Sequence, residues 1–131
     1  MCVRTRSVLL LFLLACVGCG GKSTDQLIAD LKSPQDKDRL IAVRLLPQHK
    51  GDATKVVPAL IDALKDKEND IRLSAAIGLG YFGEQGRDAI PALEAAQQDR
   101  DARIREAAGI ALSRIDPSHA PKTAPSRPRG K

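Results

Sequence analysis

The sequence predicts an all-α fold built from three stacked copies of one helical pair, and three observations support it. Residues of one type recur 33 positions apart in several separate series. The series are Leu27, Leu60 and Leu93; Arg39, Arg72 and Arg105; Ala42, Ala75 and Ala108; and Leu46, Leu79 and Leu112. Aromatic residues make up only 2% of the chain, so the core is aliphatic, which favours close-packed helices over a sheet. Leucines four positions apart also share one helical face. Stacked repeats present extended surfaces, so binding is the favoured class of function.

The first segment of the chain has the features of an export signal. Arg4 and Arg6 precede an apolar run over residues 8–17. A helix needs about 20 apolar residues to cross a bilayer, and this run is about half that length. We therefore interpret residues 1–18 as a signal peptide, outside the fold.

The cysteines at the end of this segment resemble the lipobox of bacterial lipoproteins, in which a lipidated Cys becomes the mature N-terminus. Cys19 follows a fuller apolar run and precedes two glycines, whereas Cys16 has the better matching residues before it but a shorter run. We favour Cys19, with Cys16 as the alternative; an ordinary secretory signal with incidental cysteines is the third possibility. The resemblance implies acyl chains such as palmitate, with residues 19–23 as a tether to the membrane.

Each repeat is expected to begin with a short helix, near residues 26–32, 59–65 and 92–98. Ser23 and Gln26 fit a capping box for the first of these helices. Pro58 and Pro91 fit the first position of the other two, where a missing backbone N–H costs nothing.

The second helix of each pair is expected over residues 39–46, 72–79 and 105–112, with Ser33 and Pro34 as the start of the first one. Gly80 and Gly83 are expected to end the second, and Asp116 followed by Pro117 the third. The three repeats are then 24–57, 58–90 and 91–116. Loops of about 2–8 residues join the helices into antiparallel pairs.

The second repeat carries a family resemblance. Its pattern is Asp70-Ile71-Arg72, Ala75-Ala76, Leu79-Gly80, Gly83 and then Ile90-Pro91-Ala92-Leu93. This pattern resembles the bacterial HEAT repeat of the type also found in phycobilisome lyases, and the resemblance covers residues 24–116. Pro47 and Ser113 depart from the glycine at position 80, as terminal repeats often do. The resemblance implies a short right-handed α-solenoid and a role in protein–protein interaction. Lyase activity is not expected to transfer to three repeats.

The arginine series has two interpretations. In repeats of this family, the Arg typically pairs with an acidic residue of an adjacent loop. The chain offers four such acids: Asp66, Asp70, Asp99 and Asp101. We therefore interpret Arg39, Arg72 and Arg105 as a structural ladder that fixes the register of the repeats. The alternative is a stripe that binds anions.

The outward side of the second helices suggests a binding surface. Positions that are usually polar in such repeats are apolar here, and the candidate face comprises Leu40, Leu73, Ile77, Tyr81 and Ile110, with Arg44, Glu106 and Arg114 as its polar rim. Leu73, Ile77 and Tyr81 lie four residues apart and form one stripe. An apolar centre with a charged rim and a lone Tyr is typical of protein interfaces. The alternative is that a short, weakly curved stack buries these side chains in its core.

Composition and motifs indicate no catalytic or cofactor chemistry. The three cysteines all lie in the leader, and His49 and His119 are the only histidines, so no metal site is expected. Nucleotide loops and nucleophile motifs are absent from the sequence, and we expect no enzyme activity, cofactor or small-molecule ligand. Without the two arginines of the leader and the four basic residues of the tail, 15 basic side chains remain against 16 acidic ones. Nucleic acid is therefore not an expected partner.

The last segment, residues 117–131, is rich in proline, carries four basic residues and contains no acid. We expect it to be disordered, either as a plain solvated end or in contact with anionic lipid.

Together these features predict a lipid-anchored protein of the bacterial cell envelope, on its periplasmic or outer face. We expect a non-catalytic module for protein–protein interaction or assembly, with a protein partner that the sequence does not identify. One alternative is an accessory subunit of an envelope enzyme, or a lyase-like protein that handles a cofactor. Another is a structural spacer that holds the tail away from the membrane.

Overall fold

The computed structural model describes residues 21–119. The predicted signal peptide, both candidate lipidated cysteines and the tail beyond His119 lie outside this range. The described residues form six α-helices, and no strand occurs among them. The helices are α1 (Thr24–Asp30), α2 (Asp36–Leu45), α3 (Ala53–Ala63), α4 (Asn69–Gly80), α5 (Ile90–Ala96) and α6 (Ala102–Ile115). The predicted all-α class is confirmed.

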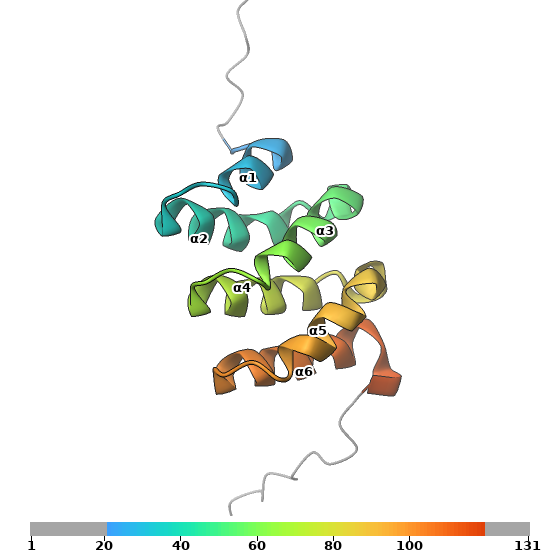
Figure 1. The fold of residues 1–131 in the computed structure, drawn as a ribbon. Helices are drawn as coiled ribbons and strands as arrows, with labels where there is room; N and C mark the ends of the chain where they lie inside the picture. Colours follow the sequence, from blue (N-terminus) through green and yellow to red (C-terminus); the bar gives the residue numbers. More distant parts are fainter. Residues whose placement is uncertain (1–20, 120–131) are drawn as a thin grey trace, which may run out of the picture.

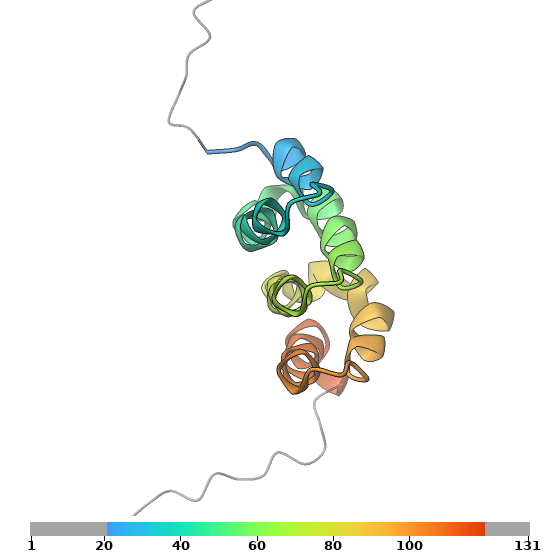
Figure 2. The ribbon, with the colours of Figure 1, turned by 60° about the vertical axis from the view of Figure 1, so that its left-hand side comes forward.

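The helices are arranged in two layers. Helices α2, α4 and α6 lie one beside the next in the first layer, and α1, α3 and α5 form the second (Figure 1). Figure 2, turned by 60°, views the first layer nearly along its helix axes and separates the two layers. Each helical pair therefore packs on the next, which gives the short right-handed α-solenoid of three hairpins that the sequence predicts.

The residues that recur at the 33-residue period form the centre of the stack. All nine Leu and Ala residues of the three apolar series are 0–1% exposed. Because the series are in register, each copy buries the same positions against its neighbours. The period of the sequence is thus the period of the core.

Helix α1 begins where the sequence predicts. The Ser23 hydroxyl accepts a hydrogen bond from the Gln26 backbone N–H at 3.3 Å, and the Gln26 side chain accepts one from the Ser23 N–H at 3.0 Å. These two bonds are the predicted capping box.

Helix α3 begins earlier than predicted. It starts at Ala53, so Pro58 lies inside the helix and not at its first position, and the repeat boundary predicted at 57/58 falls within the helix. A proline there removes one backbone hydrogen bond, the one that would reach the carbonyl of Thr54. The additional turn buries Val56 and Val57, which are 0% and 2% exposed, and this burial offsets the lost bond. Pro91, in contrast, does lie in the first turn of α5.

The second helices begin a few residues before the predicted positions. Ser33 and Pro34 precede α2 and do not form its first turn, because the helix starts at Asp36. Helix α4 ends at Gly80, and Gly83 adopts a positive φ of 53° at the start of a 3₁₀ segment, Gly83–Ala89. This segment makes the turn from the second repeat to the third.

The C-terminal end of the stack is more ordered than predicted. Helix α6 ends at Ile115, before Asp116 and Pro117, as expected. However, Pro117–His119 form a 3₁₀ turn. His119 lies between two carboxylates, 3.3 Å from both Glu94 and Asp116. The prediction of disorder from residue 117 onward is therefore wrong for residues 117–119, which these contacts hold against α5.

Candidate interaction surface

The arginine ladder joins each repeat to the next through carboxylates. Arg39 donates to both carboxylate oxygens of Asp66, at 2.8 and 3.2 Å. Arg72 makes the same pair of bonds with Asp99, at 2.9 and 3.3 Å. Each arginine also donates to two backbone carbonyls of the loop before its own helix. The guanidinium groups of Arg39 and Arg72 thus bind the next repeat and fix its register, as the structural interpretation expects.

The carboxylates of the ladder are held in their charged form. Burial opposes ionisation of Asp66, but the hydrogen bonds from Arg39 and from the backbone still lower its pKa below the ordinary value. The hydrogen bond from Arg72 is the main cause of the lowered pKa of Asp99. Outside the ladder, the pKa of Asp101 is lowered to about 2, chiefly by the hydrogen bond from Arg103.

Arg105 lacks the carboxylate that completes the pattern. It donates to the carbonyls of Asp99 and Arg100 at 2.9 and 3.0 Å, but it makes no ion pair within residues 21–119. Of the other acids considered for the ladder, Asp101 caps α6 and Asp70 lies 3.6 Å from Arg103. The ladder therefore has two ion pairs and one arginine bound to backbone alone.

The predicted apolar stripe lies on the open side of α4. Ile77 and Tyr81 are 42% and 54% exposed, and Ile110 on the neighbouring helix α6 is 46% exposed. Leu73 is half-buried and packs partly against the core. The stack thus leaves most of the stripe accessible.

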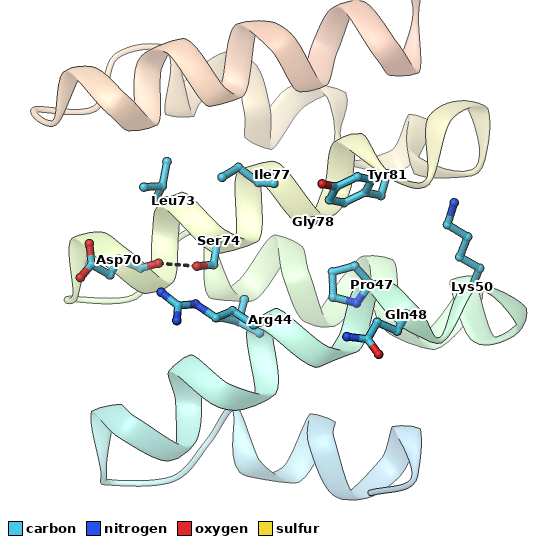
Figure 3. A pocket seen from close by; sticks show the side chains of 11 residues that line it. Arg44, Pro47, Gln48, Lys50, Asp70, Leu73, Ser74, Ile77, Gly78 and Tyr81 are labelled. Atoms are coloured by element: carbon cyan, nitrogen blue, oxygen red, sulfur yellow. Dashed lines mark hydrogen bonds between the residues drawn. The ribbon is translucent and has the colours of Figure 1, made fainter. Parts of the chain in front are cut away.

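A groove of about 590 Å³ runs between α2 and α4 along this stripe. Figure 3 shows Leu73, Ile77 and Tyr81 following one another along α4, with Pro47 opposite them just after the end of α2. The polar residues that line the groove are Arg44, Gln48, Lys50, Asp70 and Ser74. The Ser74 hydroxyl is already bonded to the Asp70 carbonyl at 2.7 Å (Figure 3). The groove is therefore an apolar channel with charged residues at its edges.

A smaller hollow of about 240 Å³ lies on the other side of the stripe, between α4 and α6. Ile77, Tyr81 and Ile110 line it together with the two rim residues Glu106 and Arg114. The Arg114 guanidinium lies 5.8 Å from the centre of the Tyr81 ring, so it covers part of the aromatic face. The stripe is thus shared by two adjoining hollows.

The structure changes the membership of the surface in two ways. Leu40 lines neither hollow and packs partly against the core, although it belongs to the predicted face. Val43, Pro47, Lys50 and Asp70 line the larger groove and were not predicted. Val43 lies on α2, and Pro47 lies four residues later in the 3₁₀ turn Leu46–Gln48 that follows this helix. That spacing of four in the first repeat is the sequence signal that would have indicated them.

Three further findings concern the lining of the hollows, metal ligands and membrane spans in the described residues. No histidine or cysteine lines either hollow. Within residues 21–119, no three His, Cys, Asp or Glu side chains are grouped closely enough to hold a metal ion. None of the described helices has both the length and the apolar character required to cross a membrane.

Comparison with known proteins identifies the family. The family model of HEAT repeats matches residues 24–124. The structure is similar to a chain in the complex of CpcE and CpcF of phycocyanin lyase from Nostoc sp. PCC7120, at 29% sequence identity and a TM-score of 0.68. This similarity covers 79% of the present chain and 42% of that chain, so the present chain spans less than half of its length. Comparison with curated proteins gives no match. Because the family model covers most of the sequence, the chain belongs to the HEAT-repeat family.

Proposed function

We propose that this chain is a non-catalytic interaction or assembly module that binds a protein partner through the exposed stripe of α4. The observation that carries the proposal is the exposure of Ile77 and Tyr81 beside a mostly apolar groove. A contiguous apolar patch with a polar rim is a common feature of protein-binding sites. Large side chains such as Tyr also contribute strongly at the centre of interfaces.

The proposal includes an anchor. Lipidation of Cys19, with Cys16 as the alternative, would hold the module on a membrane of the bacterial cell envelope. Two residues separate Lys22 from Cys19, and α1 begins at Thr24, so the stack would sit close to the lipid surface. The support for this part is the sequence pattern alone.

A second candidate function is an accessory subunit of an envelope enzyme, or a lyase-like protein that handles a cofactor. The similarity to the phycocyanin lyase complex and the volume of the larger groove favour it. Small-molecule sites are commonly clefts of about 300–1,000 Å³, lined mainly by apolar side chains. A small molecule that copurifies with the chain, detected by native mass spectrometry, would support this candidate over the first.

The test of the main proposal is crosslinking in the cells that make the protein, followed by capture of the full chain. We compare wild type with Ile77→Glu/Tyr81→Glu, which places charges on exposed positions and should leave helicity unchanged. Ile41→Glu is the matched control, because Ile41 is 51% exposed and lines neither hollow. A Cys19→Ser variant in the same experiment tests the anchor.

We expect one protein to be captured by wild type and by Ile41→Glu, and to be lost from Ile77→Glu/Tyr81→Glu. We expect Cys19→Ser to leave the membrane fraction and to lose palmitate label. If all variants capture the same proteins, the stripe is not the binding surface. If Cys19→Ser keeps the label and Cys16→Ser loses it, the anchor is Cys16.

A further inference from the structure

Helix α6 carries two opposite charges placed evenly about an exposed isoleucine. Glu106 lies four residues before Ile110, Arg114 lies four residues after it, and all three side chains are exposed. Neither charged residue forms an ion pair with any residue from 21 to 119. The helix thus presents an acid, an apolar residue and a base in one line.

Helix α4 repeats this spacing with apolar residues. Leu73 lies four residues before Ile77 and Tyr81 four residues after it, as Figure 3 shows along the helix. Ile77 and Ile110 are one period apart, so they occupy the same row of the stack. A Cβ on Gly80 would lie 3.1 Å from the Ala111 Cα, so the two helices approach closely at this point.

Such a surface is complementary to itself. A rotation of 180° about the row from Ile77 to Ile110 reverses the helix direction, and it exchanges the acidic end of α6 for its basic end. We propose that the α4/α6 surface binds a second copy of this chain across a two-fold axis along this row. Glu106 then faces Arg114 of the partner subunit, and the isoleucines of the row meet at the axis.

The same surface supplies both halves of each contact, which distinguishes a second copy from an unrelated partner. Every charge pair forms twice, because the contact is symmetric. The proposal rests on the proposed function, since it uses the exposed face of α4, and it identifies one partner of that face. Arg44 occupies the same row on α2, where two copies would repel, so the contact is confined to α4 and α6.

The test is sedimentation equilibrium of the purified full chain in detergent. Glu106→Arg and Arg114→Glu each place like charges opposite one another, and each should weaken the dimer by about tenfold or more. The double variant Glu106→Arg/Arg114→Glu should restore it. An equimolar mixture of the two single variants should form heterodimers, because one copy then carries both bases and the other both acids.

Ile41→Glu is the control, because Ile41 is exposed and lines neither hollow, and it should leave the dimer unchanged. Circular dichroism checks that each variant folds, and recovery in the double variant or in the mixture excludes misfolding as the cause of dissociation. A monomeric wild type, or a double variant that stays dissociated, overturns the inference. A monomeric wild type that still captures a different protein through Ile77 and Tyr81 leaves the proposed function standing. A wild type that forms the dimer but captures no other protein supports this inference and gives no support to binding of a different protein.

Discussion

At the scale of single residues, Asp66 and Asp99 each serve two repeats at once. Each accepts two hydrogen bonds from an arginine of the preceding repeat and one from a backbone N–H two residues ahead. Ser33 holds the same position in the first repeat and keeps the backbone bond, at 3.2 Å, without a charge. The loop conformation therefore needs only an oxygen at this position, whereas the junction between repeats needs a carboxylate.

We expect Arg72→Ala to lower the free energy of unfolding by about 3 kcal/mol. It leaves Asp99, whose side chain is 14% exposed, without its charged partner in a partly buried position. Arg105→Ala is the matched control. It removes the two equivalent bonds to backbone carbonyls but leaves no carboxylate without a partner. It should therefore lower the free energy of unfolding by about 1 kcal/mol or less. Urea unfolding at neutral pH measures the free energy of unfolding of both variants. Equal decreases would show that the ion pair between Arg72 and Asp99 contributes nothing to stability.

The effect of Arg72→Ala should also depend on pH. Because the pKa of Asp99 is lowered in the folded protein, its pairing contributes stability above the unfolded pKa of about 3.9 and loses it as pH falls further. The difference between wild type and Arg72→Ala should therefore shrink in acid. A difference that stays constant as the pH falls below about 4 would indicate lost packing in place of a lost ion pair.

At the scale of helices, the sequence predicts correctly which segments are helical, but it predicts less well the residue at which each helix begins. The capping box of α1 is a local signal of two side chains, and it marks the start correctly. The start of α3 depends on tertiary burial of Val56 and Val57, which no local signal reports, and a proline within the helix conceals it.

The candidate surface could likewise be predicted only in part, because the exposure of each side chain depends on tertiary packing. The period places Ile77 and Ile110 at one exposed position of the stack, but Leu40 and Leu73 share another position, and both pack partly against the core.

Glycines within the second helices differ in how closely a neighbouring element approaches. A Cβ on Gly78 of α4 would lie 2.8 Å from the Pro47 Cγ and 3.3 Å from a Leu60 methyl. A Cβ on Gly109 of α6 would meet its nearest atom, the Gln97 side-chain nitrogen, at 3.5 Å. Gly78 is thus required by packing, and Gly109 is not.

We therefore expect the same substitution to have opposite effects at these two positions. Gly78→Ala should lower the free energy of unfolding by about 1–3 kcal/mol through overpacking. Gly109→Ala should raise it by about 0.5–1 kcal/mol, because alanine favours the helical conformation. Thermal unfolding of the two variants beside wild type provides the measurement. Stabilisation by both would mean that α2 and α4 separate readily to admit a methyl group.

At the scale of the whole molecule, the stack has a strong centre and a weaker first helix. Helix α4 packs against both α2 and α6, and half of its 12 residues are buried. Helix α1 has seven residues, of which only Thr24 and Leu27 are buried. The Thr24 hydroxyl bonds to His49 at 3.1 Å and to Asp52, which attaches this end to the turn before α3. Since contacts in a solenoid are made between neighbours, a defect at one end need not spread.

Leu27→Ala and Leu79→Ala test this arrangement, because they remove the same atoms from positions that are 1% and 0% exposed. Each substitution should cost about 2–5 kcal/mol at its own site. We expect Leu79→Ala to accelerate amide hydrogen exchange in every helix, since α4 joins the two halves of the core. Leu27→Ala should accelerate exchange mainly in α1, through local detachment of that helix. Hydrogen exchange followed by mass spectrometry resolves the helices separately. If Leu27→Ala accelerates exchange in α4 and α6 as much as in α1, the three repeats unfold as one unit, and the N-terminal end of the stack would be as firmly held as its centre.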